Sequence, residues 1–600
     1  MMNPFQEHLI ASGYFYNEST KIWSGQNFED ISYNDGDNIE NRIFKILKNS
    51  NDLSSLSDEL KLFCTDWPST YHLSSSRSNI LRPFERDLTG DVLEIGSGCG
   101  AITRYLGECG GNVLALEGTS RRSLITRKRT KDLDNVTVLS EQFQKFKINK
   151  KFDVITLIGV LEYSSLYVSS DTPTLTMLKQ IKKLLKPNGK LIIAIENQLG
   201  LKYFAGAPED HIGKPFFGIE NHYTKNHACT FGRYDLNNIL TSSGFANVEF
   251  LAPFPDYKFP SSIITEKGLN DEFFDATYFA TQTVINDPQM PRELSFSPQL
   301  AWKTIFKNRM TMDLSNSFLI LASNKKNISR TEDIIAYHYS SSRAKKLCKS
   351  TIFIKNKKNK ISVLSERLDL KSAANYHLNG FKNKIIRLQD YHNGDLLLDN
   401  FTEVLAKDNW DKDDLKFLLI KYISILEKII GIPLSHSQNI LIDGKYIDCT
   451  PQNIIIEDES FTFFDKEWIF DKKICIGYLL YRSLFALTSQ TYRLGKTNEK
   501  FKKNFIGFFL FSTKLLGWRV SRTELTQYMK LEYQFQKTVR ASKFIYKEYC
   551  HNMRAELSFF SNLESTKIQL NNMSKEREVF AEELICQSHW GSSINVKYQD

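Results

Sequence analysis

A strand that ends in an acid and then runs into three glycines is the clearest chemical signal in the chain. The segment LEIGSGCG, residues 93 to 100, contains Glu94 followed by Gly96, Gly98 and Gly100. Glycines at this spacing let the backbone pass close beneath a nucleoside cofactor, because no side chain blocks the approach. Glu94 is placed to meet the amino-acid end of S-adenosylmethionine (SAM), and we interpret the segment as a SAM site. The alternative is an ordinary tight turn.

Two later strand ends favour the cofactor interpretation. The apolar run NVLAL ends in Glu117, about twenty residues beyond the glycine turn, where an acid can accept both ribose hydroxyls. The run FDVITLIGVLEYSS reads as the fourth strand of a parallel sheet and then offers Glu162 as a further cofactor contact. An amphipathic stretch, a Pro-Asn-Gly turn and the strand KLIIAIEN follow. This alternation predicts an α/β fold with a doubly wound, Rossmann-like sheet.

The order and the amino-acid sequences of these segments resemble those of class I SAM-dependent methyltransferases. Four further phrases are similar to the methyltransferases of bacterial O-antigen and other surface-polysaccharide loci, particularly chain terminators fused to a kinase-like domain. They are WPSTYHLSSSRSNILRPF (67–84), IENQLGLKYFAGAPEDHIGKPFFGIENHY (195–223), CTFGRY (229–234) and PFPDYKFP (253–260). The resemblance covers residues 67 to 323. It implies that the second phrase lies over the cofactor and helps to form the pocket for a polysaccharide acceptor.

That second phrase gathers acids, imidazoles and a phenol in a loop that Gly and Pro interrupt. If the acceptor is a sugar hydroxyl, methyl transfer requires a base, and His211 is our candidate. An acceptor oxygen that is already anionic would need no base. The alternative is that His211 and His222 only brace the loop through hydrogen bonds.

Four other residues are candidates for cofactor contacts. The segment SEQFQKF places Glu141, Gln142 and Phe143 where such methyltransferases have an acid and an adenine-facing side chain. The sequence leaves open whether Glu141 or Gln142 meets the adenine amino group. Arg77, in YHLSSSR, is a candidate partner for the methionine carboxylate, and the alternative is an ordinary surface arginine.

A second chemical pattern lies in the last third of the chain, in YIDCTPQNIII and FTFFDKEW. It resembles the catalytic loop and metal-binding strand of small-molecule and polysaccharide kinases. The resemblance implies that Asp448 orients an acceptor hydroxyl while Asn453 and Asp465 hold Mg²⁺ on ATP. Two departures stand out: Tyr446 replaces a histidine, and Asp-Lys-Glu-Trp replaces Asp-Phe-Gly.

The strands upstream of that pattern read as a kinase-like small lobe whose chemistry is incomplete. IAYHYSSSR, STIFIKN and KISVLSERL give a hairpin and a third strand, but SSSRAKK lacks phosphate-wrapping glycines. Ser365 occupies the place of the expected lysine, for which Arg367 or Lys360 could substitute. An active kinase and a degenerate nucleotide-binding or scaffold domain therefore both stay open.

These landmarks divide the chain into five parts. We expect an N-terminal helical cap or lid (1–88), the methyltransferase domain (89–325), a linker (326–335), the kinase-like domain (336–518) and a helical C-terminal region (519–600). We expect the last region to pack on the kinase-like domain. The alternative is that it oligomerises, or binds a partner such as a glycosyltransferase or polymerase.

Composition excludes several function classes. The chain has 600 residues, of which 41% are hydrophobic, which is ample for packed cores. Its net charge of +9 is spread along the chain, so we expect no nucleic-acid partner. Nine cysteines without a CxxC pair predict neither disulfides nor structural zinc. The N-terminus lacks a signal-peptide pattern, so we expect a cytoplasmic enzyme, attached peripherally to the inner membrane at most.

Overall fold

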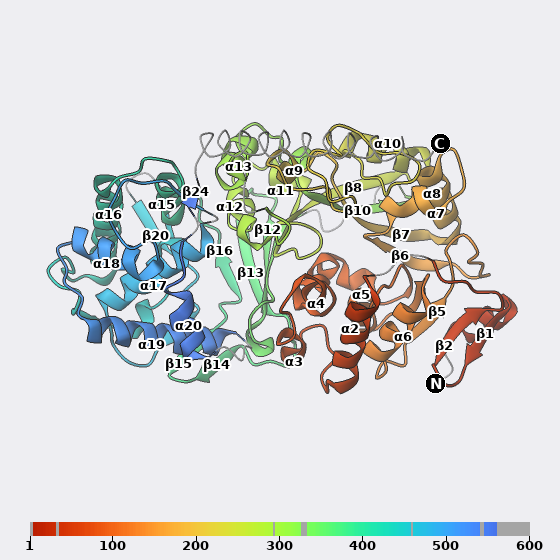
Figure 1. Cartoon of the computed structure of the whole chain (residues 1–600), viewed down its shortest axis with the longest axis horizontal. Helices are drawn as coiled ribbons and strands as arrows, with labels where there is room; N and C mark the ends of the chain where they lie inside the picture. Colours follow the sequence, from red (N-terminus) through yellow and green to blue (C-terminus); the bar gives the residue numbers. More distant parts are fainter. Residues whose placement is uncertain are drawn as a thin grey trace, which may run out of the picture.

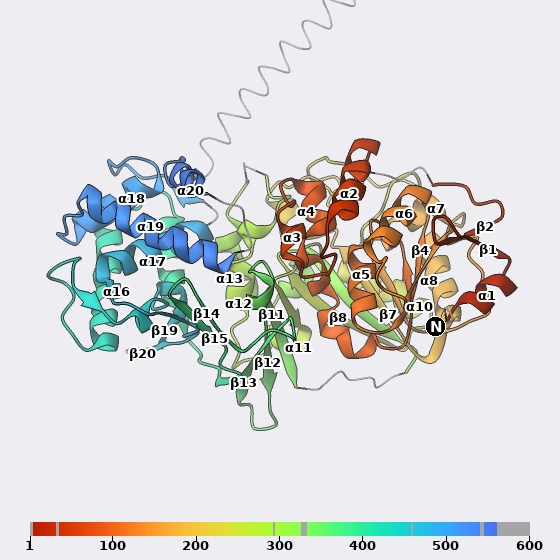
Figure 2. The same ribbon diagram turned by 90° about the horizontal axis from the view of Figure 1, so that it is seen from below.

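One mixed sheet of 14 strands runs through most of the molecule, in the order β1-β2-β5-β4-β3-β6-β7-β10-β8-β9-β11-β12-β13-β16 (Figure 1). The computed structural model describes residues 4–31, 35–291, 294–325, 333–457, 460–491, 493–540, 545–557 and 559–560. The helical region that follows β16 lies at one end of the molecule, and the hairpin β1–β2 lies at the other (Figure 2).

Five parallel strands form the part of the sheet that carries the glycine turn. They are β3 (Asp91–Ile95), β4 (Asn112–Glu117), β5 (Val136–Ser140), β6 (Phe152–Ile158) and β7 (Leu185–Glu196). Their order is β5-β4-β3-β6-β7. From β3 the chain continues to β4 and β5 on one side, and it then crosses to β6 and β7 on the other side of β3. Ligands in such sheets bind outside the carboxyl ends of the strands at this switch point. The predicted doubly wound sheet is confirmed.

The sheet is covered on both faces, as its uninterrupted apolar strands predict. On one face Val92 packs with helix α5 (Ala101–Glu108). On the other, Leu93 packs with helices α8 (Pro173–Leu184) and α10 (Arg233–Ser242). Helix α6 (Ser120–Arg129) lies next to α5 (Figure 1). The amphipathic stretch predicted before KLIIAIEN is helix α8.

The Pro-Asn-Gly segment differs from its prediction as a turn. The structure includes it in β7, where the pairing with β6 shifts from Phe152↔Leu185 to Val154↔Lys190. The additional residues form an irregularity at the start of the strand, because Pro187 has no amide hydrogen to donate to a ladder.

The sheet does not end with the methyltransferase strands. Strand β10 (Ser317–Ser323) runs antiparallel between β7 and β8 (Asn247–Phe254). Strand β9 (Ser262–Thr265) then joins β8 to β11 (Ile334–Ser340). Most of the predicted linker, residues 326–332, lies outside the described residues, and β11 begins within its last two positions.

The predicted small-lobe strands continue the same sheet. Strand β11 pairs with β12 (Lys349–Lys355), β12 with β13 (Ile361–Arg367), and β13 with β16 (Leu388–Asp390), all antiparallel.

The N-terminal segment, predicted as helical, also contains strands. Strands β1 (Tyr14–Asn17) and β2 (Ile22–Gly25) form a hairpin, and β2 extends the sheet by parallel pairing with β5. The buried rings of Tyr14 and Trp23 hold it on the core. Helices α2 (Asp37–Asn49) and α4 (Trp67–Leu73) follow the hairpin.

The region after β16 is mainly helical and has its own core. Its longest helices are α16 (Lys412–Ile430), α17 (Ile476–Gln490), α18 (Phe505–Leu515) and α19 (Arg522–Val539). Helix α16 buries apolar side chains such as Leu419 and Leu426 in this core. Met529 and Phe535 of α19 are buried in this core, and α20 (Tyr546–Asn552) packs beside them. The rest of the predicted C-terminal helices, residues 561–600, lies outside the described residues.

Two helices of intermediate length are α13 (Pro298–Lys307) and α15 (Leu397–Leu405). The remaining helices are short: α1 (Gln6–Ala11), α3 (Asp58–Lys61), α7 (Ser164–Tyr167), α9 (Leu201–Phe204), α11 (Glu266–Leu269), α12 (Thr277–Thr281) and α14 (Thr311–Leu314). Short strands complete the fold: β14 (Asn375–Leu378), β15 (Phe381–Lys384), β17 (Asp395–Leu396), β18 (Leu441–Ile442), β19 (Ile454–Glu457), β20 (Ser460–Phe463), β21 (Trp468–Phe470), β22 (Ile474–Cys475), β23 (Leu494–Gly495) and β24 (Phe559–Phe560). Among the described residues, no helix has the length and apolar character needed to span a bilayer.

Candidate active site

The glycine turn has the backbone geometry that its sequence predicts. Gly96, Gly98 and Gly100 have φ angles of +78°, +54° and +79°, a region that side chains disfavour. A Cβ on Gly96 would lie 2.6 Å from a methyl carbon of Val160, and one on Gly100 would lie 2.9 Å from the Thr126 Cα. A Cβ on Gly98 would meet no atom within 4 Å. Two glycines therefore allow tight packing, while Gly98 borders open space.

Glu94 and Glu117 flank this turn from the neighbouring strands β3 and β4. One carboxylate oxygen of Glu117 accepts a hydrogen bond from the Gly98 amide at 2.7 Å. The Glu94 carboxylate accepts one from the Thr103 hydroxyl at 2.5 Å. Burial raises the pKa of both carboxyl groups, that of Glu94 to about 8, and each group is within electrostatic reach of the other. An open-faced glycine between two buried acids fits the ribose and the ammonium group of SAM.

Arg77 is buried, which contradicts the alternative of an ordinary surface arginine. Its side chain is 4% exposed, and the guanidinium lies 4.2 Å from the ring centre of Tyr71. One terminal nitrogen donates to the carbonyl oxygen of Lys258 at 2.9 Å. The charge of Arg77 also acts on Glu94, so the residue lies near the predicted amino-acid end of the cofactor. Its contact with the methionine carboxylate stays a prediction.

The predicted adenine contacts separate in space. The Glu141 amide donates to the Glu117 carbonyl oxygen at 3.0 Å, which places Glu141 beside the ribose candidate. The Gln142 side chain instead donates to the Glu29 carbonyl oxygen at 2.9 Å. Phe143 packs against the core. Glu141 therefore lies nearer to the ribose candidate, and the adenine contact of either residue stays a prediction.

Glu162 lies together with His211 and a third residue, Glu196, which the sequence did not single out. Glu162 lies in a single helical turn after β6 (Leu161–Tyr163), and Glu196 is the last residue of β7. One potential ligand atom from each residue lies within 4.8 Å of the others. Strands β6 and β7 are parallel neighbours, so their carboxyl ends bring these side chains to the same edge.

His211 is held between an aromatic hydroxyl and these acids. Its Nδ1 lies 3.1 Å from the Tyr163 hydroxyl, and its Nε2 lies 3.7 Å from a Glu196 oxygen. Burial alone would lower the pKa of His211, but the charge of Glu196 outweighs it and raises the pKa to about 9. An imidazole that is protonated at neutral pH cannot accept a proton. In this arrangement the charge of Glu196 opposes the action of His211 as a base, and that role stays a prediction.

Two buried lysines extend this cluster and are the main residues that sequence reasoning missed. Lys258 contacts Glu196 at 2.5 Å and Asp210 at 2.8 Å. Lys202 contacts Asp256 at 3.1 Å and Asp210 at 3.4 Å. These residues come from the phrases 195–223 and 253–260, so the signal that could have found them is the alternation of acids and lysines within those phrases.

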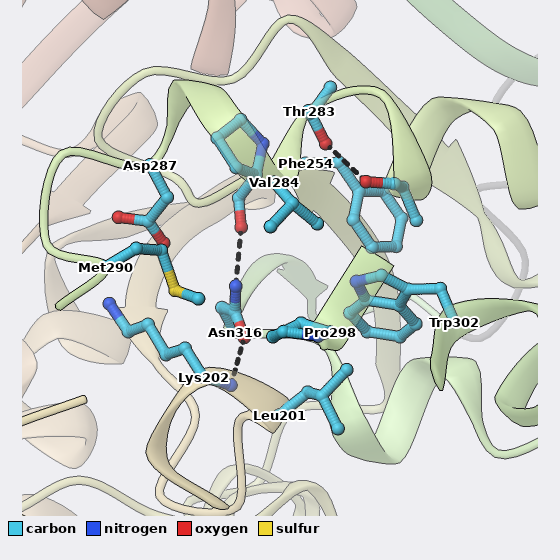
Figure 3. Close-up of a pocket in the computed structure, with 12 residues that line it drawn as sticks. Leu201, Lys202, Phe254, Thr283, Val284, Asp287, Met290, Pro298, Trp302 and Asn316 are labelled. Carbon is cyan, nitrogen blue, oxygen red and sulfur yellow. Dashed lines mark hydrogen bonds between the residues drawn. The ribbon is translucent and has the colours of Figure 1, made fainter. Parts of the chain in front are cut away.

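A small cavity opens beside Lys202 (Figure 3). Its apolar wall includes Val284, Pro298 and Trp302, whereas Lys202 and Asp287 lie on the opposite side. Asn316 accepts a hydrogen bond from the Lys202 amide at 3.0 Å and donates one to the Pro255 carbonyl at 3.0 Å. Through Asn316, which directly precedes β10, these bonds join helix α9 to the segment that follows β8.

The predicted kinase-like residues lie near one another, but Asp448 faces inward. Its oxygens accept from the Trp468 amide at 2.8 Å and contact Arg482 at 3.3 Å. Burial raises the pKa of Asp448 to about 7. Asn453 donates to the Asp448 carbonyl at 2.9 Å and so braces the loop. The catalytic and metal-binding roles of these residues stay predictions.

A lysine does lie beside Asp465, although neither substitute named from the sequence provides it. Lys349, at the start of β12, contacts Asp465 at 2.9 Å and Glu467 at 3.0 Å. Arg367 instead donates to Asn383 and backbone carbonyls, and Lys360 contacts Asp390 at the surface. Lys349 directly precedes the strand segment STIFIKN. The sequence does not show how this strand is aligned with its neighbours, and that alignment brings Lys349 to Asp465.

Comparison with known proteins identifies the class of the first domain. Residues 93–191 match the sequence profile of a family described as "Methyltransferase domain". No curated protein matches the chain.

Two solved structures illustrate the likeness. Phosphoethanolamine N-methyltransferase 2 of Haemonchus contortus, in complex with S-adenosylhomocysteine, is 14% identical with a TM-score of 0.25; the match covers 41% of this chain and 52% of that one. The chain thus matches about half the length of the Haemonchus protein. N-methyltransferase NodS of Bradyrhizobium japonicum, also with S-adenosylhomocysteine, is 18% identical with a TM-score of 0.24, over 37% of this chain and 94% of that one.

The family match and the glycine turn between Glu94 and Glu117 together identify this part of the chain as a class I SAM-dependent methyltransferase domain.

Proposed function

We propose that this protein transfers the methyl group of SAM to the growing end of a cell-surface polysaccharide of the O-antigen type. The observation that carries the methyltransferase part is the glycine turn, with Gly98 open to one side and bonded to Glu117. SAM, when bound, supplies an electrophilic methyl group on a sulfonium. Glu117 would hold the ribose, and Glu94 with Arg77 would hold the two charges of the amino-acid end.

The polysaccharide acceptor rests on the resemblance, and the geometry supports it in one respect. The phrases 195–223 and 253–260 meet in the cluster of Glu196, Asp210 and Lys258, which Arg77 links to the cofactor residues. A buried polar cluster next to a cofactor suits an acceptor that is rich in hydroxyl or phosphate oxygens.

The kinase-like region would phosphorylate the terminal sugar before methylation, and methylation would then block further glycosyl transfer and set chain length. Its support is the approach of Lys349 to Asp465, an arrangement that can hold a phosphate and its Mg²⁺. The alternative is a degenerate kinase fold that acts as a scaffold for a polymerase, which would work from the cytoplasmic side of the membrane.

Isothermal titration calorimetry tests both parts. We expect the protein to bind SAM and Mg²⁺-ATP, with SAM binding lost in Glu117→Ala and ATP binding lost in Asp465→Ala. Each variant is the folding control for the other ligand. SAM binding without ATP binding would support the scaffold alternative, and no SAM binding would overturn the enzyme proposal. Methyl transfer from labelled SAM to free sugars, but not to polysaccharide, would favour a small-molecule methyltransferase.

A further inference from the structure

The carboxyl ends of β6 and β7 hold an unusual set of three buried donor atoms. One oxygen of Glu162, one oxygen of Glu196 and Nε2 of His211 have no hydrogen-bond partner among the described residues. Glu162 is 1% exposed and Glu196 is fully buried. Buried polar atoms are nearly always hydrogen-bonded, and the 3.7 Å between Nε2 of His211 and the Glu196 oxygen is too long for a hydrogen bond, so these three atoms need an explanation. We propose that Glu162, Glu196 and His211 form a binding site for a divalent cation.

The second contacts of Glu196 and His211 hold these two side chains in place beside each other. The other oxygen of Glu196 contacts Lys258 at 2.5 Å and accepts from the Tyr257 hydroxyl at 3.2 Å. The Nδ1 atom of His211 lies 3.1 Å from the Tyr163 hydroxyl. When Nδ1 carries the hydrogen and donates it to Tyr163, the lone pair of Nε2 faces the two carboxylates. Metal-binding histidines are oriented in this way by a partner on the other ring nitrogen.

The surrounding charge also favours a cation. Five carboxyl groups lie in or beside the cluster: Glu162, Glu196, Asp210, Asp256 and Asp287. Lys258, Lys202 and the protonated His211 face them, and a metal ion bound at Nε2 would take the place of the His211 proton. Buried charges of one sign must be balanced by opposite charge or by protons. A divalent cation bound to three of these side chains would supply part of the missing positive charge.

The donor set indicates the class of ion. Two carboxylate oxygens and one imidazole nitrogen suit Mn²⁺, Fe²⁺ or Zn²⁺ better than Ca²⁺, which takes six to eight oxygens. Three protein ligands leave coordination positions open. On the proposed function, oxygen atoms of the acceptor would fill those positions. That last step depends on the methyltransferase proposal, whereas the cation site itself does not.

Mn²⁺ is the probe that tests the site directly, without SAM or acceptor. We expect wild-type protein to bind Mn²⁺ in calorimetry and to show electron spin echo modulation from a bound imidazole nitrogen. In Glu162→Gln and His211→Gln, the dissociation constant should rise at least tenfold and the nitrogen signal should disappear. The matched control is His222→Gln, an exposed histidine on the same loop, which pairs with Glu220 and should bind as wild type does.

The kinase-like region needs its own control, because Asn453 and Asp465 are candidate metal ligands. Asp465→Asn should retain the Mn²⁺ site with the nitrogen signal, whatever happens to a second site. Wild-type protein without Mn²⁺ binding, or with Mn²⁺ that shows no nitrogen coupling, would overturn the proposal and mean that protons balance the cluster. Since Mn²⁺ is titrated alone, a failure of SAM binding in a separate titration would contradict the proposed function and not the cation site.

Discussion

Replacing Glu94 by glutamine should make the protein more stable at alkaline pH while it weakens SAM binding. Glu94 is 3% exposed, and its carboxyl group accepts a hydrogen bond from the hydroxyl group of Thr103. Burial, opposed in part by the Thr103 bond, raises its pKa from 4.5 to about 8. The folded protein therefore prefers the neutral acid, whereas the unfolded chain ionises at its ordinary pKa.

The sign and size of the effect follow from this difference. Below pH 4.5 both states carry the proton, and between pH 4.5 and 8 only the folded state does, so wild-type stability falls as the pH rises through that window. One pKa unit corresponds to about 1.4 kcal/mol, so the full loss is at most about 5 kcal/mol. Glutamine does not titrate. Any cost of its unpaired amide group is the same at every pH, so the difference between variant and wild type isolates the ionisation.

Thermal and urea denaturation from pH 5 to pH 9, followed by tryptophan fluorescence, measures this difference. Glu94→Gln should gain several kcal/mol relative to wild type over the range. Glu85→Gln is the matched control, since Glu85 is an exposed acid in the segment that precedes β3, and its difference should stay constant. A constant difference for Glu94→Gln would refute the claim that a buried, neutral acid lies under the glycine turn.

Three further outcomes test other parts of the site. SAM binding at pH 7 should release about one proton, measured by calorimetry in buffers of different ionisation enthalpy, because an ammonium beside Glu94 favours its charged form; no release would place the ammonium elsewhere. Gly98→Ala should cost only about 1–2 kcal/mol of stability yet abolish SAM binding, whereas Gly100→Ala should destabilise more, because its Cβ would meet the Thr126 backbone; equal melting temperatures would contradict this. Lys258→Met should cost about 3–5 kcal/mol in denaturation experiments, since Glu196 and Asp210 lose a buried partner. The exposed Lys225→Met should cost almost nothing.

The sequence predicts those parts of the site that depend on local pattern. Glu94, the glycines and Glu117 follow from strand ends and backbone geometry, which a short segment determines by itself. Lys202, Lys258 and Glu196 were not predicted as site residues, because their roles arise only when β7, the loop after it and the segment after β8 come together. Such contacts between distant segments leave no periodic signal in the chain.

The same reasoning explains the edges of the sheet. The sequence predicts a helical cap over residues 14–25, where the structure has a hairpin, because the pairing partner of this hairpin, β5, lies more than a hundred residues away. The sequence does not predict the pairing of β9 with β11 either. Several helices and strand β10 separate the two strands along the chain, and nothing in the sequence indicates that they are neighbours. The register between strands likewise depends on contacts between distant segments. Lys349 reaches Asp465 because β12 pairs with β11 and β13 in one particular register.

The shared sheet makes the two regions one structural unit. Strand β9 follows directly from the segment of Lys258, and it pairs with β11, which leads into the turn at Ser341. In a kinase that turn would cover phosphates, but here Ser341 accepts hydrogen bonds from Ser75 at 2.7 Å and Asn79 at 2.8 Å in the N-terminal segment. The turn is therefore anchored to the N-terminal segment, and any movement of the turn would have to break these hydrogen bonds.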